Sequence, residues 1–505
     1  MESIKGDMRA IILAAGRGKR LWPITDKIPK PLVRVANTPI IEYQIKNLLA
    51  SGIENIIIVV GYKGEMIQSF CQARFPSVNI KIIKNADFLK TNNAYSFYLC
   101  RRYLDRDIIL MNGDVIFEED IIKKLINENS TCVCVDKGAY ADESMKIVVE
   151  NGFIRDISKT IPATESYGTS IDIYKISKKD LVTLKVYLQK FIEVERNLNA
   201  WTEVLLQKLF RERKILAKPL NIEGYKWVEI DNYEDLDMAE QIFNKKLHSL
   251  KNKKLIFIDG DGTLFIGNRV IKEGKTFLDF LKKKGKRFYF VTNNSSKTIY
   301  EYYKKLKEMN FNITPGDILV STDALIKFLL QKNYKNIYLV ANREVSKYFE
   351  EKGFIIDGNN PDCVVLTYDD EITYKKLKTA AILINRNLPY YATHIDKFCP
   401  TEEGNVPDIG SYIELLKATT GKYPLATFGK PSLNIILPVL KENRVSLEDT
   451  VIVGDRLYTD IKMGENNNLT TVLVLSGETR REDLVDSKIQ PDIIIKNLGE
   501  LVKYI

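Results

Sequence analysis

Two stretches of this chain join an apolar strand to a loop whose residues suit phosphate chemistry. The first, residues 11–21 (IILAAGRGKRL), ends in glycines and basic side chains, and the second, residues 255–264 (LIFIDGDGTL), ends in aspartates. Small residues let backbone N–H groups approach a polyphosphate closely, whereas a carboxylate can attack phosphorus. The sequence therefore predicts two phosphate-handling sites of opposite design, on two catalytic domains.

The first loop is predicted to hold a nucleoside triphosphate. Its small residues are Ala14, Ala15, Gly16 and Gly18. Its positive charges, which suit a pyrophosphate leaving group, are Arg17, Lys19 and Arg20. A Rossmann dinucleotide loop is excluded because the third glycine is missing, and a P-loop because the Gly-Lys-Ser/Thr ending is missing.

Further candidates follow in the same half. Lys30 lies in a PKPL segment, and Asp114 ends the apolar strand before it in an Asn-Gly-Asp turn, where a carboxylate can hold a cation. Residues 226–236 (KWVEIDNYEDL) add Lys226, Glu229 and Asp231.

The second loop has the residue types of an aspartate-based phosphatase. Asp259 and Asp261 lie two residues apart, so one can act as nucleophile and the other as general acid and then base. A phosphate approaches two carboxylates only with positive charge nearby, so Mg²⁺ and a lysine are required. The chain offers hydroxyl and amide donors, a lysine in FGKPS, and two aspartates after a later strand: Thr292, Asn293, Asn294, Lys430, Asp455 and Asp460.

Strand-like and helix-like segments alternate along the chain, which is typical of the α/β class with mostly parallel sheets. Strands are expected at 11–13, 56–60, 80–83 and 108–111, with an amphipathic helix at 39–49 and a helix around 236–243. A new series begins with strands at 255–258, 288–291, 337–340, 363–366 and 451–453. We therefore expect two domains, 1–247 and 253–505, with residues 244–254 ending a helix and forming a short connector.

Residues 8–245 resemble the sugar-phosphate nucleotidyltransferases, especially the branch close to phosphocholine cytidylyltransferase. The resemblance rests on LAAGRGKRL, PKPL, Asn92–Ser96 before Asn-Gly-Asp, and EIDNYEDL. It implies a Rossmann-like, GT-A-like mixed sheet, and attack by an acceptor phosphate on the α-phosphorus with release of pyrophosphate. It also implies Mg²⁺ on Asp114 and Asp231 and catalytic roles for Lys30 and Arg20. The implied nucleotide contacts are Leu13, Ala14, Ala15, Gly16, Arg17, Gly18, Lys19, Asn93, Ser96 and Gly113.

Several residues of this half allow two interpretations. Tyr95, Phe97 and Tyr98 fit either a cage for a quaternary ammonium or core packing. Glu203 fits either an acceptor pocket or an ordinary helix face. Lys146 and Lys159 resemble acceptor-phosphate positions, although a lone lysine usually lies on the surface. Glu229 and Asp235 compete with Asp231 as metal ligands.

Residues 253–505 resemble the NagD-like phosphatases of the haloacid dehalogenase superfamily, on the motifs DGDGT, TNN, GKP and GDRLYTD. The resemblance implies a Rossmann-like core with an α/β cap inserted at about 296–425. Asp259 is then the phosphorylated nucleophile and Asp261 the acid and base. The implied phosphate ligands are Thr292, Lys430, Asn293 and Asn294, and the implied Mg²⁺ ligands are Asp259, Asp261, Asp455 and Asp460. Residues 400–412 (PTEEGNVPDIGSY) replace a glycine-rich cap stretch of relatives, which leaves the substrate open.

Composition excludes several other classes. The chain has 505 residues, 45% hydrophobic and 28% charged, with a net charge of +9, which is typical of globular proteins. Basic runs such as residues 282–287 (KKKGKR) are expected to be solvated, so no nucleic-acid partner is predicted. No apolar run or signal peptide indicates membrane insertion. Six scattered cysteines favour a reduced cytoplasmic chain, with Cys132 and Cys134 as core residues.

The sequence thus predicts a bifunctional enzyme. One half transfers a nucleotidyl group, with CTP favoured, to a small phosphorylated alcohol, polyol or sugar, and the other hydrolyses a phosphomonoester. We expect a CDP-activated precursor for surface (capsule) polysaccharide, while oligomeric state, homo-oligomers included, stays open. The alternatives are another nucleoside triphosphate with a sugar 1-phosphate, one domain serving only as a regulatory binding module, and a nucleic-acid-binding protein suggested by charge alone.

Overall fold

The computed structural model describes residues 8–505 except 139, 141–142, 357–358, 402–403 and 466. The chain forms two compact units, Met1–Asn244 and Lys245–Ile505. Each unit buries its own clusters of apolar side chains, so each is described by itself.

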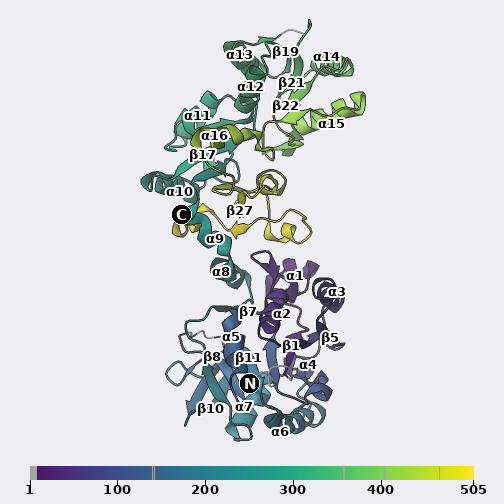
Figure 1. Ribbon diagram of the computed structural model, residues 1–505, viewed down its shortest axis with the longest axis vertical. Coiled ribbons are helices and arrows are strands. Elements are labelled where there is room, and N and C mark those ends of the chain that lie inside the picture. Colours follow the sequence, from purple (N-terminus) through teal and green to yellow (C-terminus); the bar gives the residue numbers. More distant parts are fainter. Residues whose placement is uncertain (1–7, 139, 141–142, 357–358, 402–403, 466) are drawn as a thin grey trace. The chain divides into compact units, whose positions relative to one another are not determined.

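The first unit is built on a mixed sheet in the order β10-β9-β11-β6-β1-β4-β5 (Figure 1). Its parallel part consists of β1 (Arg9–Ala14), β4 (Asn55–Val60), β5 (Asn79–Lys84) and β6 (Ile108–Asn112). Its antiparallel part consists of β8 (Cys132–Asp136), β9 (Lys146–Glu150), β10 (Phe153–Ser158) and β11 (Gly168–Ile176), with β12 (Lys218–Asn221) parallel to β8. The predicted mixed sheet is confirmed.

Both faces of this sheet are buried. Ile11 and Leu13 of β1 enter one apolar cluster, while Ala10, Ile12 and Ala14 enter the other, as expected for a strand covered on both sides. Cys132 and Cys134 lie in the second cluster, as predicted. The helices are α1 (Ile24–Lys27), α2 (Ile40–Ala50), α3 (Gly64–Arg74), α4 (Asn93–Leu99), α5 (Glu119–Ile126), α6 (Lys178–Gln189), α7 (Thr202–Arg211) and α8 (Tyr233–Phe243). Short antiparallel pairs are β2 (Arg34–Val35) with β3 (Thr38–Pro39), and β7 (Val115–Phe117) with β13 (Trp227–Glu229).

The second unit has a parallel core sheet in the order β18-β17-β14-β26-β27-β28. These strands are β14 (Leu255–Asp259), β17 (Arg287–Thr292), β18 (Ile318–Val320), β26 (Thr450–Gly454), β27 (Thr470–Val474) and β28 (Ile493–Ile495). The accompanying elements are α10 (Lys272–Lys283), α11 (Ile299–Glu308), α16 (Leu437–Asn443), and a hairpin of β15 (Phe265–Ile266) and β16 (Arg269–Val270).

A second parallel sheet, ordered β20-β19-β21-β22-β25, forms the cap (Figure 1). Its strands are β19 (Asn336–Val340), β20 (Ile355–Ile356), β21 (Cys363–Leu366), β22 (Tyr390–Ala392) and β25 (Ala426–Thr427). Its helices are α12 (Ser321–Gln331), α13 (Arg343–Glu351), α14 (Tyr374–Asn385) and α15 (Ile409–Thr420), and β23 (Phe398–Thr401) pairs with β24 (Gly404–Pro407).

The predicted start of the cap at residue 296 is too early. Strand β18 pairs with β17 in the core sheet, and Tyr302 and Leu306 of α11 belong to the core's apolar cluster. The cap cluster instead begins with Leu325 of α12. Apolar packing therefore places the insertion at α12–β25.

The connector predicted at 244–254 also differs from the structure. Asn244 ends α8, and a new helix, α9 (Lys245–Ser249), follows it. Leu247 and Leu250 are buried in the core cluster of the second unit, so the division falls at 244/245 and not after 247. The polar composition of this stretch concealed these two anchoring leucines.

No helix in the described part of the chain is long and apolar enough to span a lipid bilayer.

We predict that Leu250→Ala destabilises the second unit by about 2–5 kcal/mol, the usual cost of truncating a buried leucine. Calorimetry of the full chain should show a lower unfolding temperature for that unit only. Leu330→Ala is the control, since Leu330 is 48% exposed. An unchanged second transition in Leu250→Ala would contradict the packing of residues 245–252 described above.

Candidate active sites

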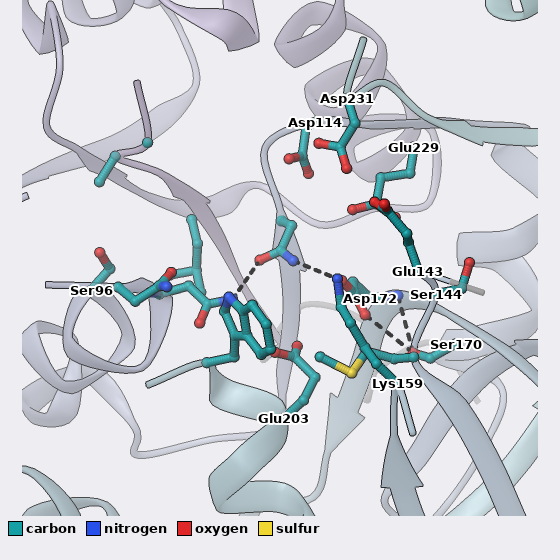
Figure 2. Close-up of a pocket in the computed structure, with 18 of the residues that line it drawn as sticks. Ser96, Asp114, Glu143, Ser144, Lys159, Ser170, Asp172, Glu203, Glu229 and Asp231 are labelled. Carbon is teal, nitrogen blue, oxygen red and sulfur yellow. Dashed lines mark hydrogen bonds between the residues drawn. The ribbon is translucent and has the colours of Figure 1, made fainter. Parts of the chain in front are cut away.

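The first unit contains a cavity of about 280 Å³ at the carboxyl ends of β1 and β6 (Figure 2). Parallel strands deliver their following loops to the same sheet edge, so the glycine loop after β1 meets the Asn-Gly-Asp turn after β6. The candidate residues that line it are Leu13, Ala15, Gly16, Arg20, Asn93, Ser96, Asp114, Lys159, Glu203, Glu229 and Asp231.

A lysine and three acids meet at one end of this cavity. Oxygen atoms of Asp114, Glu229 and Asp231 lie within 4.8 Å of one another. Nζ of Lys30 donates to Asp114 and Asp231, at 2.7 Å each, and Arg20 pairs with Asp231 at 2.6 Å. Burial alone would lower the pKa of Lys30, but the two carboxylates outweigh it and raise that pKa. Lys30 therefore stays protonated.

This acidic cluster has spare capacity for a cation. Oδ1 of Asp114 is buried and accepts no hydrogen bond from any described residue. Burial, reinforced by the charges of Asp114 and Asp231, raises the pKa of Glu229 to about 8. Crowded carboxylate oxygens of this kind are the ligands that Mg²⁺ prefers, so the residues present fit the ion. Figure 2 shows the three acids together at the top of the cavity.

Two other candidates near Asp231, Asp235 and Lys226, lie outside the residues that line the cavity. Oδ2 of Asp235 accepts the backbone N–H groups of Asp231 and Asn232 and completes the capping box of α8. The Lys226 side chain is exposed, with Nζ 3.8 Å from Glu118. Asp235 thereby fixes the loop that carries Asp231.

The glycine loop divides its basic residues between two hollows. Arg20 lines the main cavity, whereas Arg17 and Lys19 line an adjacent one, where the Arg17 guanidinium stands 5.5 Å from the Tyr62 ring centre. Gly18 has φ 63°, and a Cβ there would lie 2.9 Å from Cβ of Lys30. A glycine is needed at this position so that Lys30 can reach the acids.

Two predicted nucleotide contacts, Ala14 and Gly113, lie behind the cavity wall. Gly113 donates its N–H to the carbonyl of Leu13, and a Cβ on Gly113 would lie 3.1 Å from Cβ of Ala14. These residues hold β1 and the Asn-Gly-Asp turn close together.

The opposite end of the cavity contains a buried polar group that the sequence analysis missed. The hydroxyl of Tyr174 lies 2.9 Å from Asp172 and 2.8 Å from Glu203. Burial raises the pKa of Asp172, and the charge of Glu203 adds to this effect. Asp172 has φ 57° at an irregularity of β11. A charged residue inside an apolar strand (TSIDIYKI) was the available signal.

The structure decides between several of the alternatives left open. Glu203 lines the cavity. Phe97 and Tyr98 are core residues with Tyr95 packed against them, which supports core packing over an aromatic cage. Contrary to the usual place of a lone lysine, Lys146 is buried. Lys159 is exposed and lines the cavity, 4.9 Å from the Trp201 ring centre.

The second unit has a cavity of about 100 Å³ at the carboxyl ends of its core strands. Asp259 ends β14 and Asp455 follows the neighbouring strand β26. With Asp460 they form a buried cluster whose oxygen atoms lie within 4.8 Å of one another. Nζ of Lys430 donates to Asp259 and, at 2.6 Å, to Asp460. The two charges overcome the effect of burial and raise the pKa of Lys430.

Asp455 is arranged like Asp114. Its Oδ2 accepts the N–H of Glu478 at 2.7 Å, while Oδ1 is buried without a hydrogen-bond partner among the described residues. Burial, with the charges of Asp259 and Asp460, raises the pKa of Asp455. The aspartates therefore fit a divalent cation.

Asp261, Thr292, Asn293 and Asn294 also line this cavity, but the two asparagines are occupied by protein partners. The Asn293 amide donates to Asp396 and to the Lys430 carbonyl, and its Oδ1 accepts the Lys430 N–H at 2.6 Å. Oδ1 of Asn294 accepts from Ser296. The side chain of Asn293 therefore holds the lysine loop, in place of the phosphate contact expected for it.

Five further charged residues of this cavity were missed: Lys297, Lys305, Asp396, Asp408 and Arg456. Asp396 comes shortly after β22, just as Asp259 and Asp455 come at or after their strands. A carboxylate at a strand's end was thus a usable signal, but the cap's place over the core was not visible in the sequence.

Comparison with known proteins finds a family for each half of the chain. Residues 9–144 match the nucleotidyl transferase family, residues 256–355 the haloacid dehalogenase-like hydrolases, and residues 427–501 a related hydrolase-like family. The second half is 32% identical over 257 residues to 5′-nucleotidase YutF of Bacillus subtilis, covering 51% of this chain and all of that protein. It is 32% identical over 255 residues to an acid sugar phosphatase of Staphylococcus haemolyticus, covering 50% of this chain and 95% of that protein. A 4-nitrophenylphosphatase structure from Thermotoga maritima is 39% identical, with a TM-score of 0.49 and coverage of 51% of this chain and 98% of that one.

The chain therefore belongs to the haloacid dehalogenase-like hydrolases through its second half and carries a nucleotidyl transferase domain in its first. It is a bifunctional enzyme, a nucleotidyltransferase fused to a phosphatase.

We predict that Asn293→Ala lowers phosphatase turnover, since Lys430 loses the bonds that place it, and costs about 1–3 kcal/mol of stability through unpaired buried groups. Steady-state kinetics with p-nitrophenyl phosphate and thermal unfolding measure the two effects. Asn467→Ala is the control, because the Asn467 amide donates to carbonyls of its own turn, those of Met463 and Glu465. Wild-type turnover in Asn293→Ala would contradict this role.

Proposed function

We propose that the first half transfers a cytidylyl group from CTP to a small phosphorylated alcohol, polyol or sugar, and that the second half hydrolyses a phosphomonoester through an aspartyl phosphate. One observation carries the proposal. Each unit has a buried aspartate oxygen, on Asp114 in the first and on Asp455 in the second, that lacks a hydrogen-bond partner among the described residues. Each of these aspartates lies close to two further carboxylates. A protonated lysine is hydrogen-bonded within each cluster. Both sites are thus suited to divalent cations and anionic phosphorus.

In the first half, catalysis requires positioning and charge neutralisation more than a protein nucleophile. The glycine loop presents backbone N–H groups to the triphosphate, and Arg20 with Lys30 neutralises the departing pyrophosphate. The acceptor's phosphate oxygen forms a bond to the α-phosphorus as the bond to the β-phosphate oxygen breaks. Glu203 and Asp172, at the other end of the cavity, would contact the rest of the acceptor.

Asp114, Asp231 and Glu229 would hold Mg²⁺ in the first half, and Asp259, Asp455 and Asp460 in the second, with Asp261 beside them. When bound, Mg²⁺ supplies positive charge that offsets the phosphate oxygens and the crowded carboxylates.

In the second half, a carboxylate oxygen of Asp259 attacks the phosphorus, and the bond to the leaving alcohol breaks. Asp261 gives its proton to the alcohol oxygen and then takes one from the water that cleaves the aspartyl phosphate, so that Asp259 is restored and phosphate is released. Lys430 and Thr292 hold the phosphate oxygens during both steps.

The choice of CTP rests on the resemblance to the phosphocholine cytidylyltransferase branch. A fused phosphatase suits a shared route in which the phosphatase prepares the precursor of the acceptor or removes a phosphate that the transferase does not use. A phosphatase of sugars among the relatives supports this substrate class. We propose that the product is a CDP-activated precursor of surface polysaccharide, made in the cytoplasm.

The substrates can be tested by a pyrophosphate-release screen. The full chain with Mg²⁺ is offered four nucleoside triphosphates against phosphorylated alcohols, polyols, amino alcohols and sugar 1-phosphates. We expect release with CTP and a small phosphorylated alcohol. Release only with another nucleotide and a sugar 1-phosphate would replace our proposal by that alternative.

Reciprocal variants should separate the two activities. Asp114→Asn should reduce pyrophosphate release at least about 100-fold while phosphate release persists, and Asp259→Asn should do the reverse, because each removes a charge acting in one transition state only. Chelation by EDTA should stop both activities, and Mg²⁺ should restore them. Retention of both activities in either variant would contradict the site assignments.

A further inference from the structure

The cap contributes a cluster of polar side chains to the phosphatase cavity. Atoms of His394, Asp396 and Asp408 lie within 4.8 Å of one another, and all three residues are buried. Asp408 lines the cavity and begins α15, where its Oδ1 accepts the N–H of Ile409 at 2.6 Å. It lies in the segment 400–412, the departure from relatives that left the substrate open.

His394 lies behind Asp408 and is fully buried. Its Nδ1 accepts the backbone N–H of Asp396 at 3.3 Å, which leaves Nε2 as the ring nitrogen that can donate. Nε2 has no hydrogen-bond partner among the described residues, and Oδ1 of Asp408 stands 3.7 Å from it. Because an unpaired buried donor is unfavourable, Nε2 favours an Asp408 carboxylate that stays beside it.

The cavity combines these acids with cations. Lys297, Lys305 and Arg456 also line it, and Nζ of Lys305 stands 4.4 Å from the Phe265 ring centre. The lysines would repel an ammonium group on the substrate. Asp396 and Asp408 would repel a carboxylate group on the substrate. A neutral hydroxyl avoids both conflicts, since it can donate to a carboxylate and accept from an ammonium.

The size of the cavity restricts the leaving group as well. The cavity, at about 100 Å³, is small beside pockets for drug-sized molecules, which have about 300–1,000 Å³. A glycerol-sized alcohol suits this space better than a nucleoside does.

We propose that Asp408 determines the specificity of the phosphatase by accepting a hydrogen bond from a hydroxyl of a small polyol phosphate, and that His394 is a positioning residue acting through Asp408. This inference rests on the proposed phosphatase function. According to this inference, residues of the cap select the substrate of the second half, and the core carboxylates perform the chemistry.

The test compares kcat/KM of the full chain, with Mg²⁺, for glycerol phosphate and for p-nitrophenyl phosphate, which has no free hydroxyl. Asp408→Ala should lower kcat/KM for glycerol phosphate, relative to kcat/KM for p-nitrophenyl phosphate, about tenfold or more. The reason is that a charge-assisted hydrogen bond to the substrate hydroxyl is lost. Asp408→Asn, which retains the acceptor for Ile409 and hence the cap of α15, should lower this ratio less. Glu414→Ala, an exposed acid on the same helix, should leave it unchanged.

His394 is tested by separating KM from kcat. His394→Ala should raise KM for glycerol phosphate more than it lowers kcat, and His394→Gln, which retains a side-chain donor, should restore part of the loss. An equal fall with both substrates in Asp408→Ala and Asp408→Asn would overturn the inference, since the residue would then serve only the fold of the cap.

The wild-type protein, assayed with p-nitrophenyl phosphate, glycerol phosphate and the nucleotide UMP, distinguishes failure of this inference from failure of the phosphatase function. Hydrolysis of p-nitrophenyl phosphate without hydrolysis of glycerol phosphate, or a preference for UMP over glycerol phosphate, would overturn the inference and leave the phosphatase function in place. Hydrolysis of none of the three would overturn both.

Discussion

Repulsion between buried carboxylates is the constraint on which both halves of this protein depend. Asp114, Glu229 and Asp231 in one unit, and Asp259, Asp455 and Asp460 in the other, lie too close together to be stable as uncompensated anions. In each unit one lysine ammonium, of Lys30 or Lys430, bonds two of these acids. Positive charge is therefore a condition of folding at these sites as well as of catalysis.

Strand pairing produces both clusters, in a different way in each unit. Parallel strands end at a common edge, so a carboxylate after each of two neighbouring strands is brought near the other without any local sequence signal between them. Asp259 at the end of β14 and Asp455 after β26 are placed in this way. Asp114 after β6 instead meets Glu229 and Asp231 because β13 pairs antiparallel with β7, the strand that follows Asp114. Glycines then allow close approach: Gly18 makes room for Lys30, and a Cβ on Gly262 or Gly477 would collide with Asp455.

Elements with a strong apolar pattern, such as β1, α2 and β26, were predictable from the sequence. The reason is that the order of apolar and polar residues within each short segment indicates the strand or helix. Sites that depend on residues far apart were predictable only where a motif marks both partners, as with Asp259 and Lys430. Asp172 and Asp408 carry no such motif, and the cap boundary depends on which sheet β18 joins. Leu247 and Leu250 were concealed by the lysines around them.

The side chain of Asn293 links the cap of the phosphatase to the loop that carries Lys430. One amide group connects Asp396 of the cap to the backbone of Lys430 in the core. Displacement of the cap would break that connection and release the loop that aims the lysine at phosphate. Movement of the cap and placement of Lys430 are thereby coupled through a single side chain.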